Sequence, residues 1–304
     1  MAHAESHERE LAVPKGTPLN RKSASTNATS PLPRARRIVT RAEGRRHGPV
    51  TRVVSPGDIG QLIKPYIFLD YFDFVPLGDP IFPMHPHSGI ATITILLSGD
   101  MRYEDTTGAS GHLSTGSVEW MRAGNGVWHD AGPMGIDRFQ GYQMWVALPP
   151  ELENGPAHSQ YLSSAEVPRE GPARIILGSY GDSTSKVDAP AGMTTLHVQL
   201  ASGERWRFQP PAGHTIAWTH ACSGVLFADG AKIEKELVVF SESEDGIEFV
   251  AMGDTDFILA SAVKHPHDLV TGYYSVHTGE EALIKGEAEI ARIGQELRAQ
   301  GRIR

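Results

Sequence analysis

The sequence contains almost no cysteine, with Cys222 the only one in 304 residues. A single cysteine cannot form an internal disulfide, and it cannot by itself supply a cysteine-based zinc site. This scarcity excludes disulfide-rich secreted domains and zinc-finger proteins, and it favours a reducing compartment. We therefore expect a cytoplasmic protein, or a nuclear one if the source is eukaryotic.

Long hydrophobic runs are also missing. The longest apolar stretch, residues 90–97, contains two threonines and is far shorter than the roughly 20 residues that span a bilayer. Residues 1–30 contain no continuous apolar stretch of the kind that a signal peptide requires. The sequence therefore predicts no membrane partner and no secretory signal.

Glycine and proline, in contrast, are plentiful, at 32 and 21 residues. They indicate many tight turns, which favours an all-β protein. Short segments of period two recur between explicit turn sequences, a pattern typical of a sandwich or barrel. The strands expected from this pattern are 37–41, 50–54, 66–74, 90–97, 101–105, 117–122 and 142–148, and then 173–177, 194–200, 205–209, 215–218, 224–228, 236–240, 247–251 and 256–260.

The two sets of strands are similar in number, which predicts two β units in tandem. We expect the first two strands, 37–41 and 50–54, to form a hairpin through a glycine-containing turn. The predicted organisation is an N-terminal extension (1–33), a first β unit (34–150), a linker region (151–172), a second β unit (173–277) and a C-terminal helix (278–304).

The C-terminal segment changes to a helical pattern. Thr278 and Glu281 have the spacing of a capping box, in which the side chains at both positions satisfy free amides at the helix start. Apolar residues then recur at the helical spacing over about five turns, at Leu283, Ile290, Ile293 and Leu297. We expect this amphipathic helix to cover an open face or edge of one β unit.

Charge is divided unevenly along the chain. Residues 1–52 contain 11 Lys and Arg against 4 Asp and Glu, whereas the remainder contains 17 against 32. Residues 1–33 are also poor in large apolar side chains, so we expect a mobile basic extension. One interpretation is an arm that binds nucleic acid or an acidic partner, and the other is a solvated extension lying on an acidic body. The acidic body itself is not expected to bind nucleic acid, because phosphates repel it.

The clearest candidate site begins at His85-Pro86-His87. On an extended segment, residues i and i+2 point to one side, so both imidazoles can reach one point. His129 follows a Gly-Asn-Gly turn about 40 positions later and can return to face this pair inside a barrel. Three imidazoles that converge in this way form a metal site with open coordination positions, suited to Fe, Ni, Cu or Zn.

These histidines lie within a wider set of motifs. The set comprises Phe68-Leu69-Asp70-Tyr71-Phe72, His85-Pro86-His87-Ser88-Gly89, Tyr103-Glu104-Asp105, Gly116-Ser117-Val118-Glu119-Trp120-Met121, Ala123-Gly124-Asn125-Gly126-Val127-Trp128-His129 and Gln143-Met144-Trp145-Val146. In order and spacing it closely resembles the pirin family of the cupin superfamily, over about residues 36–300. The resemblance implies two tandem cupin barrels (double-stranded β-helix, or jelly roll), with one metal, usually iron, in the N-terminal barrel and none in the C-terminal one.

The resemblance also implies a ligand set, and here the sequence departs from the family. His85, His87 and His129 match the three histidine ligands, but the glutamate of the family's His-x-Glu pattern is Ala131 in this chain. Three outcomes stay open: three histidines plus water, recruitment of Asp130 by a local turn, or a weak or empty site. Glu119, where the family often has glutamine, is a further candidate as a base or an alternative ligand.

Two kinds of function follow from this resemblance. The first is a quercetin 2,3-dioxygenase-type enzyme that uses one divalent metal, with Fe2+ expected and Ni, Cu, Mn or Zn as alternatives. It would act with O2 on a small flavonol-like aromatic. The second is a metal- or redox-sensing regulator that binds a protein partner, similar to a transcription cofactor, with little or no catalysis.

Overall fold

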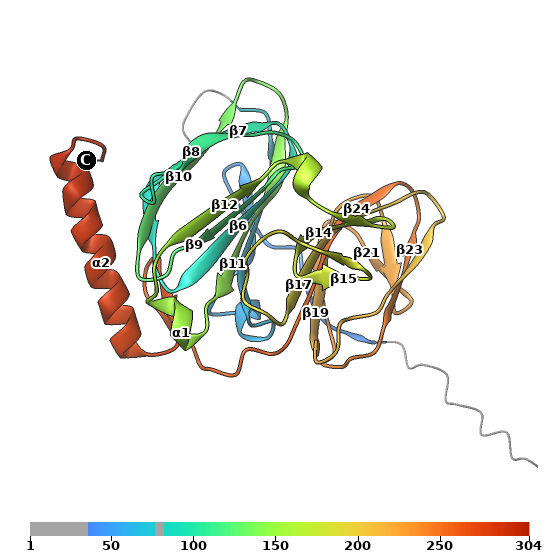
Figure 1. The fold of residues 1–304 in the computed structure, drawn as a ribbon. Helices are drawn as coiled ribbons and strands as arrows, with labels where there is room; N and C mark the ends of the chain where they lie inside the picture. Colours follow the sequence, from blue (N-terminus) through green and yellow to red (C-terminus); the bar gives the residue numbers. More distant parts are fainter. Residues whose placement is uncertain (1–35, 77–81, 304) are drawn as a thin grey trace, which may run out of the picture. The chain divides into compact units, whose positions relative to one another are not determined.

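Two seven-stranded antiparallel sheets form the centre of the structure, and each is backed by a four-stranded sheet (Figure 1). The computed structural model describes residues 36–76 and 82–303, so the extension expected over 1–33 lies outside the described residues. Each pair of sheets forms one cupin barrel, which confirms the all-β, two-barrel fold class.

The first barrel has the strand order β12-β9-β6-β11-β4-β3-β2 in its large sheet and β5-β10-β7-β8 in its small sheet. The bounds of these strands are β2 Arg45–His47, β3 Val50–Val54, β4 Tyr66–Phe74, β5 Phe82–His87, β6 Ile90–Ser98, β7 Asp100–Asp105, β8 Ser110–Leu113, β9 Val118–Arg122, β10 Val127–Met134, β11 Phe139–Ala147 and β12 His158–Leu162. Three short helices flank these strands: η1 Ile59–Gln61, α1 Pro150–Glu153 and η2 Ser164–Glu166.

The second barrel has the order β1-β22-β19-β24-β17-β14-β13 in its large sheet and β18-β23-β20-β21 in its small sheet. The bounds are β1 Ile38–Ala42, β13 Arg169–Glu170, β14 Ala173–Leu177, β17 Met193–Leu200, β18 Arg205–Phe208, β19 Ile216–Ser223, β20 Leu226–Ala228, β21 Ala231–Ile233, β22 Leu237–Phe240, β23 Ile247–Ala251 and β24 Thr255–Ala262. Two further short pairs are β15 Ser179–Tyr180 with β16 Ser183–Thr184, and β25 Val270–Thr271 with β26 Val276–His277.

The strand β1 crosses from one barrel to the other. The expected hairpin between 37–41 and 50–54 is wrong, because β1 pairs with β22 of the second barrel and β3 pairs with β2 and β4. Arg36 anchors this crossing: its side chain is 2% exposed and donates from Nε to the carbonyl of Ser241 at 2.7 Å. The first residues of the expected 34–150 unit therefore belong to the second barrel's sheet.

The other expected boundaries also shift. The region 151–172, expected as a linker, contributes β12 to the first barrel through its pairing with β9, and β13 to the second. Residues 270–277, expected in the second barrel, return to the first, where Ser275 forms a β-bridge with Ser88. Each barrel is thus completed by segments that are distant in the sequence.

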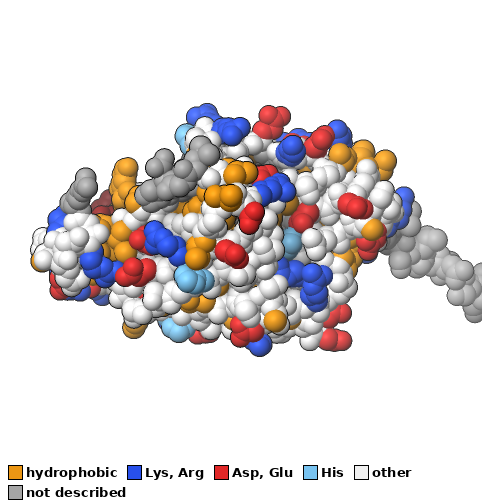
Figure 2. Space-filling view, turned by 90° about the horizontal axis from the view of Figure 1, so that it is seen from above, with side chains coloured by type: hydrophobic (Ala, Val, Ile, Leu, Met, Phe, Trp, Pro, Cys, Tyr) orange, Lys and Arg blue, Asp and Glu red, His pale blue; other side chains and the backbone are white. Residues whose placement is uncertain are grey.

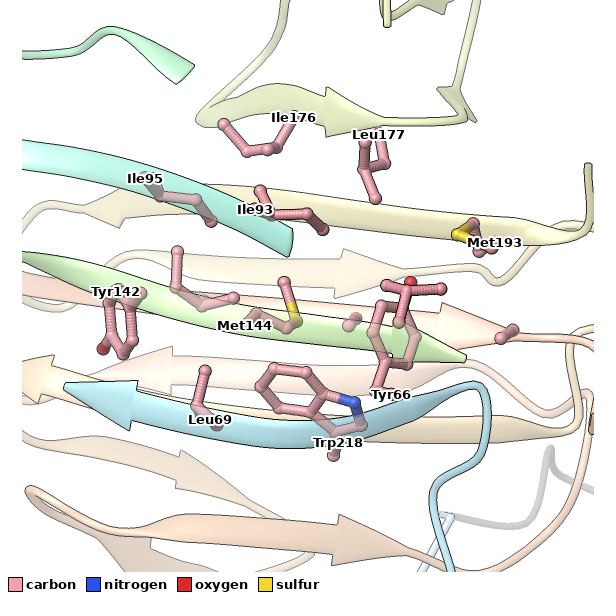
Figure 3. Packing of buried hydrophobic residues seen from close by; sticks show 14 of the residues in the cluster. Tyr66, Leu69, Ile93, Ile95, Tyr142, Met144, Ile176, Leu177, Met193 and Trp218 are labelled. Atoms are coloured by element: carbon pink, nitrogen blue, oxygen red, sulfur yellow. The ribbon is translucent and has the colours of Figure 1, made fainter. Parts of the chain in front are cut away.

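The two large sheets share one hydrophobic core, shown in Figure 3. Tyr66 and Trp218 meet edge to face at its centre, with ring centroids 5.5 Å apart. The labelled residues are Tyr66, Leu69, Ile93, Ile95, Tyr142 and Met144 from the first barrel, and Ile176, Leu177, Met193 and Trp218 from the second.

The helix α2, Glu280–Ala299, runs along the first barrel beside β10 (Figure 1). Its length confirms the expected helix of about five turns, and it buries Ile290 and Leu297. Its remaining buried positions are glycines, and a Cβ at Gly294 would lie 2.8 Å from Trp128. The predicted capping box is wrong: the helix begins after Gly279, and the Thr278 hydroxyl donates instead to Glu153 at 2.7 Å.

Among the described residues, neither α-helix combines the length and the apolar character that a transmembrane segment requires. Acidic and basic side chains are interspersed on the face shown in Figure 2. Two arginines of the basic N-terminal region form ion pairs within the fold: Arg41 pairs with Glu236, and Arg52 pairs with Asp70. Within the described part, these arginines therefore bind the protein's own acidic groups.

Candidate metal centre

Three histidines converge in the first barrel, as the sequence predicts. His85 and His87 lie on β5 and His129 on β10, and these strands pair so that His129 faces His85. One ring nitrogen of each histidine lies within 4.8 Å of the others. The Nε2 atoms of His85 and His129 are 3.1 Å apart. Strand register therefore brings together residues that are about 40 positions apart.

The turn before β10 depends on a glycine. Gly124 has a φ of +54°, and a Cβ at this position would lie 2.2 Å from the carbonyl oxygen of Gly155. A larger residue would therefore clash with the backbone at the point that directs the chain back toward β5. The close contact between Gly124 and the backbone of Gly155 explains the first glycine of the Gly-Asn-Gly sequence before His129.

Burial keeps the cluster neutral. His87 is 1% exposed, and burial, together with the nearby His85, lowers its pKa to about 3. Burial also lowers the pKa values of His85 and His129, and for His129 the neighbouring His85 and His87 lower it further. Neutral imidazoles carry the free lone pairs that metal binding requires.

The outer ring nitrogens have partners that orient two of the rings. Nδ1 of His85 lies 2.7 Å from the carbonyl oxygen of Pro83, and Nδ1 of His87 lies 2.9 Å from that of Tyr274. When Nδ1 donates to these carbonyls, Nε2 of both rings is left as an acceptor facing the cluster. The donor set therefore fits a divalent metal, which these three histidines could hold.

A cavity of about 500 Å3 opens onto this cluster, and His85 and His87 form part of its wall. Phe68 and Trp145 stack in parallel beside them, with ring centroids 4.0 Å apart. The side-chain nitrogen of Gln143 is buried there and lacks a hydrogen-bond partner. The described residues that line the cavity are His47, Val50, Arg52, Phe68, Asp70, Phe82, His85, His87, Gln143, Trp145, Tyr273 and Tyr274.

A second hollow, of about 580 Å3, lies between α2 and the turn after β7. Charged groups such as Glu104, Arg292 and Glu296 line it, and all three belong to ion pairs. None of the three clustered histidines reaches it. We therefore place the candidate site at the histidine cavity, where ligand atoms and an aromatic wall meet.

Known proteins similar to this chain carry pirin and quercetin dioxygenase names. "Putative quercetin 2,3-dioxygenase PA2418" of Pseudomonas aeruginosa is 29% identical over 228 residues, which cover 70% of this chain and 80% of that protein. A second protein of this bacterium, "Putative quercetin 2,3-dioxygenase PA3240", is 32% identical over 60% of this chain and 68% of its own length. The sequence model of the family described as Pirin matches residues 48–146.

The chain belongs to the pirin family.

Solved structures agree with this pirin in fold. A quercetin 2,3-dioxygenase from Acinetobacter baumannii superposes with a TM-score of 0.78 at 22% identity, covering 85% of this chain and 98% of that one. The bacterial pirin YhhW from Escherichia coli, solved in complex with nickel(II), gives 0.61 at 18% identity and covers 74% and 99%.

The position at which the resemblance implies a fourth ligand is apolar in this pirin. Ala131 is buried beside Phe72 and Phe139 and offers no ligand atom. Asp130 does not join the cluster: its carboxylate accepts a hydrogen bond from Arg102 Nη1 at 2.6 Å. Alternation along β10 directs the side chain of Asp130 to the opposite face from His129, so recruitment of Asp130 finds no support in this geometry.

Glu119 lies behind His129, away from the cavity. Its Oε1 is 4.0 Å from Nδ1 of His129, whereas the other ring nitrogen, Nε2, is the one that faces His85. The side chain is 1% exposed, and burial raises its pKa to about 7. This placement argues against the role of direct ligand or substrate base that the sequence left open for it.

Several site residues had no signal of their own in the sequence. Of the tryptophans and methionines in the motifs, only Trp145 lines the cavity. Tyr273 and Tyr274 come from the segment after the second barrel, and Tyr274 acts through its backbone carbonyl. Every residue type has a backbone carbonyl, so the sequence cannot show which one accepts this hydrogen bond; only the path of the chain does.

Proposed function

We propose that this pirin is a metal-dependent dioxygenase that acts on flavonol-like aromatics. His85, His87 and His129 would be the ligands of one divalent metal, with Fe2+ preferred to Ni, Cu, Mn or Zn. The observation that carries the proposal is the three-histidine cluster, two of whose members, His85 and His87, line a cavity with an aromatic wall. The names of the relatives support the same activity.

The cavity suits a planar substrate with oxygen substituents. The stacked pair of Phe68 and Trp145 provides an apolar surface for an aromatic ring, and Trp145 lies 4.9 Å from the ring of His87. The free Nε2–H group of Gln143 would donate a hydrogen bond to a substrate oxygen. Arg52, whose guanidinium lies 4.0 Å above Phe68, would attract an anionic oxygen.

The reaction needs an acceptor for the substrate's hydroxyl proton. Asp70 is the one carboxylate among the described cavity-lining residues, and burial raises its pKa, although Arg52 opposes that shift. We assign the proton-accepting role to Asp70. A divalent metal on the histidines would supply Lewis acidity and vacant positions for a chelating substrate and O2. Both oxygen atoms of O2 would enter the products, and one ring carbon would leave as carbon monoxide.

The first prediction tests this activity. Metal-loaded protein should consume quercetin and O2 together, and His85→Ala or His129→Ala should lower turnover by at least about 100-fold, since metal catalysis contributes several kcal/mol. The measurement combines bound-metal analysis, quercetin absorbance and an O2 electrode. His112→Ala changes an exposed histidine of β8 and should leave turnover unchanged.

Two results would contradict the proposal. Metal-replete protein without turnover would reject the dioxygenase, and equal turnover in His129→Ala would reject the three-histidine site. The first result would favour the regulator instead. One contact supports that alternative. The carbonyl of Tyr274 accepts the hydrogen bond from His87, and the preceding residue, Tyr273, is 85% exposed. A protein partner that binds Tyr273 could therefore sense the state of the histidine cluster.

A further inference from the structure

A metal on three Nε2 atoms fixes where the ring protons must lie. Each ligand histidine is neutral and has its proton on Nδ1, so each Nδ1–H requires an acceptor. The carbonyl of Pro83 serves His85, and that of Tyr274 serves His87. Nδ1 of His129 is buried and has no hydrogen-bond partner. One of the three donors is therefore left unsatisfied.

Glu119 is placed to satisfy it. The residue lies on β9, where it pairs with Thr94 of β6, and Thr94 donates its hydroxyl to Oε2 of Glu119. This bond leaves Oε1 free, and Oε1 is the oxygen 4.0 Å from Nδ1 of His129. Both side chains are almost completely buried, so water does not compete for either group.

We propose that Glu119 is a positioning residue whose Oε1 accepts the Nδ1–H of His129, and that it thereby holds His129 in the tautomer that binds metal. Because the present separation of 4.0 Å is longer than a hydrogen bond, the proposal requires a rotation of one or both side chains when metal binds. The inference rests on the metal binding of the proposed function and is independent of turnover.

The position of this carboxylate gives it a second consequence. Because Ala131 contributes no negative charge, the three neutral histidines leave the charge of a divalent metal unbalanced. A carboxylate behind His129 makes the imidazole a stronger donor through the hydrogen bond. Glu119 thus supplies, from behind a ligand, part of the stabilisation that the family obtains from a direct glutamate ligand.

The second prediction tests this role with metal affinity. Glu119→Met, similar in size but without an acceptor, should weaken Ni2+ binding by about 10–100-fold in competition with a chelator. Glu119→Gln keeps one acceptor oxygen and should therefore weaken Ni2+ binding less than Glu119→Met does. Glu248→Met is the matched control, since it removes an exposed glutamate of the second barrel that pairs with Arg205, and it should change the affinity by less than about twofold.

A second measurement separates positioning from a purely structural role. In the Zn2+ form, the Nδ1–H proton of His129 should give a downfield NMR signal that persists in the wild type and moves upfield in Glu119→Gln. Ni2+ affinity and an Nδ1–H signal that are unchanged in both Glu119 variants would overturn this inference. A wild type that binds no divalent metal would overturn both proposals, whereas metal binding without turnover would reject the enzyme alone.

Discussion

At the scale of single residues, the unusual feature is that no carboxylate of the described residues joins the three-histidine cluster. Ala131 lies two positions after His129, so its side chain points to the same side of β10. Its neighbours are apolar, whereas the nearby carboxylate of Asp130 is held by Arg102. The cluster itself is therefore neutral, and in the proposed metal site the affinity would depend on three imidazoles and their acceptors.

The third prediction restores that carboxylate. Ala131→Glu should raise Ni2+ affinity by about tenfold or more, because a direct anionic ligand adds a charge-assisted bond to a divalent ion. Ala131→Gln has the same size without the charge and should give no comparable gain. Competition with a chelator measures both. Equal affinities of the two variants would show that position 131 does not reach the metal.

The three histidines themselves could be predicted from the sequence. Period-two alternation places His85 and His87 on one side, and the glycine turn at Gly124 returns His129 to them. Their acceptors could not be predicted, because the contact between His87 and Tyr274 joins residues 187 positions apart through a backbone atom. The sequence makes Glu119 a candidate site residue. It does not show which nitrogen of His129 lies next to Glu119, because that depends on the register of β9 and β6.

At the scale of elements, most strands were predicted but their partners were not. The range of β4 was expected exactly as found, since alternation is a local signal. The pairing of β1 is not local, and the neighbouring β3 was an incorrect partner for it. The capping box failed for the same reason, because Thr278 found a distant acceptor, Glu153, in place of its own helix.

The fourth prediction concerns the anchor of β1. Arg36→Met keeps the aliphatic stem but leaves the carbonyls of Ser241 and Thr215 without their donor. Loss of buried hydrogen bonds to a charged group should lower the free energy of unfolding by about 2 kcal/mol. Arg37→Met removes the neighbouring exposed arginine and should change it by less than about 0.5 kcal/mol. Urea unfolding compares the two, and similar losses would mean that Arg36 does not anchor the strand.

At the scale of the whole molecule, the two barrels share one interior. A buried hydrogen bond of 2.6 Å joins Tyr142 of the first barrel to Nδ1 of His220 of the second. The ring of Tyr71 also packs near His220, with centroids 5.5 Å apart. Burial lowers the pKa of His220 to about 4, although Glu236 opposes the shift. Burial therefore keeps the imidazole at this contact neutral in the folded protein over most of the acidic range.

The fifth prediction follows from the lowered pKa of His220. Between pH 6.5 and about 4 the unfolded chain binds a proton at His220 and the folded protein does not, so stability falls as the pH falls. His220→Gln should make this slope shallower by about 1 kcal/mol per pH unit. Urea unfolding at several pH values measures it, with the exposed His158→Gln as control. A slope that His220→Gln leaves unchanged would contradict the assignment.

The pairing of β1 with β22 also sets an order of events during synthesis. Ile38 leaves the ribosome about 200 residues before its partner Phe240. At about 5–20 residues per second, β1 waits roughly 10–40 s with its backbone groups unpaired. All strands of the first barrel, from β2 to β12, emerge within that interval. The first barrel, apart from the segment 270–277 that returns to it, is therefore in a position to fold first. The second barrel closes only when the last third of the chain reaches the strand that was made at the start.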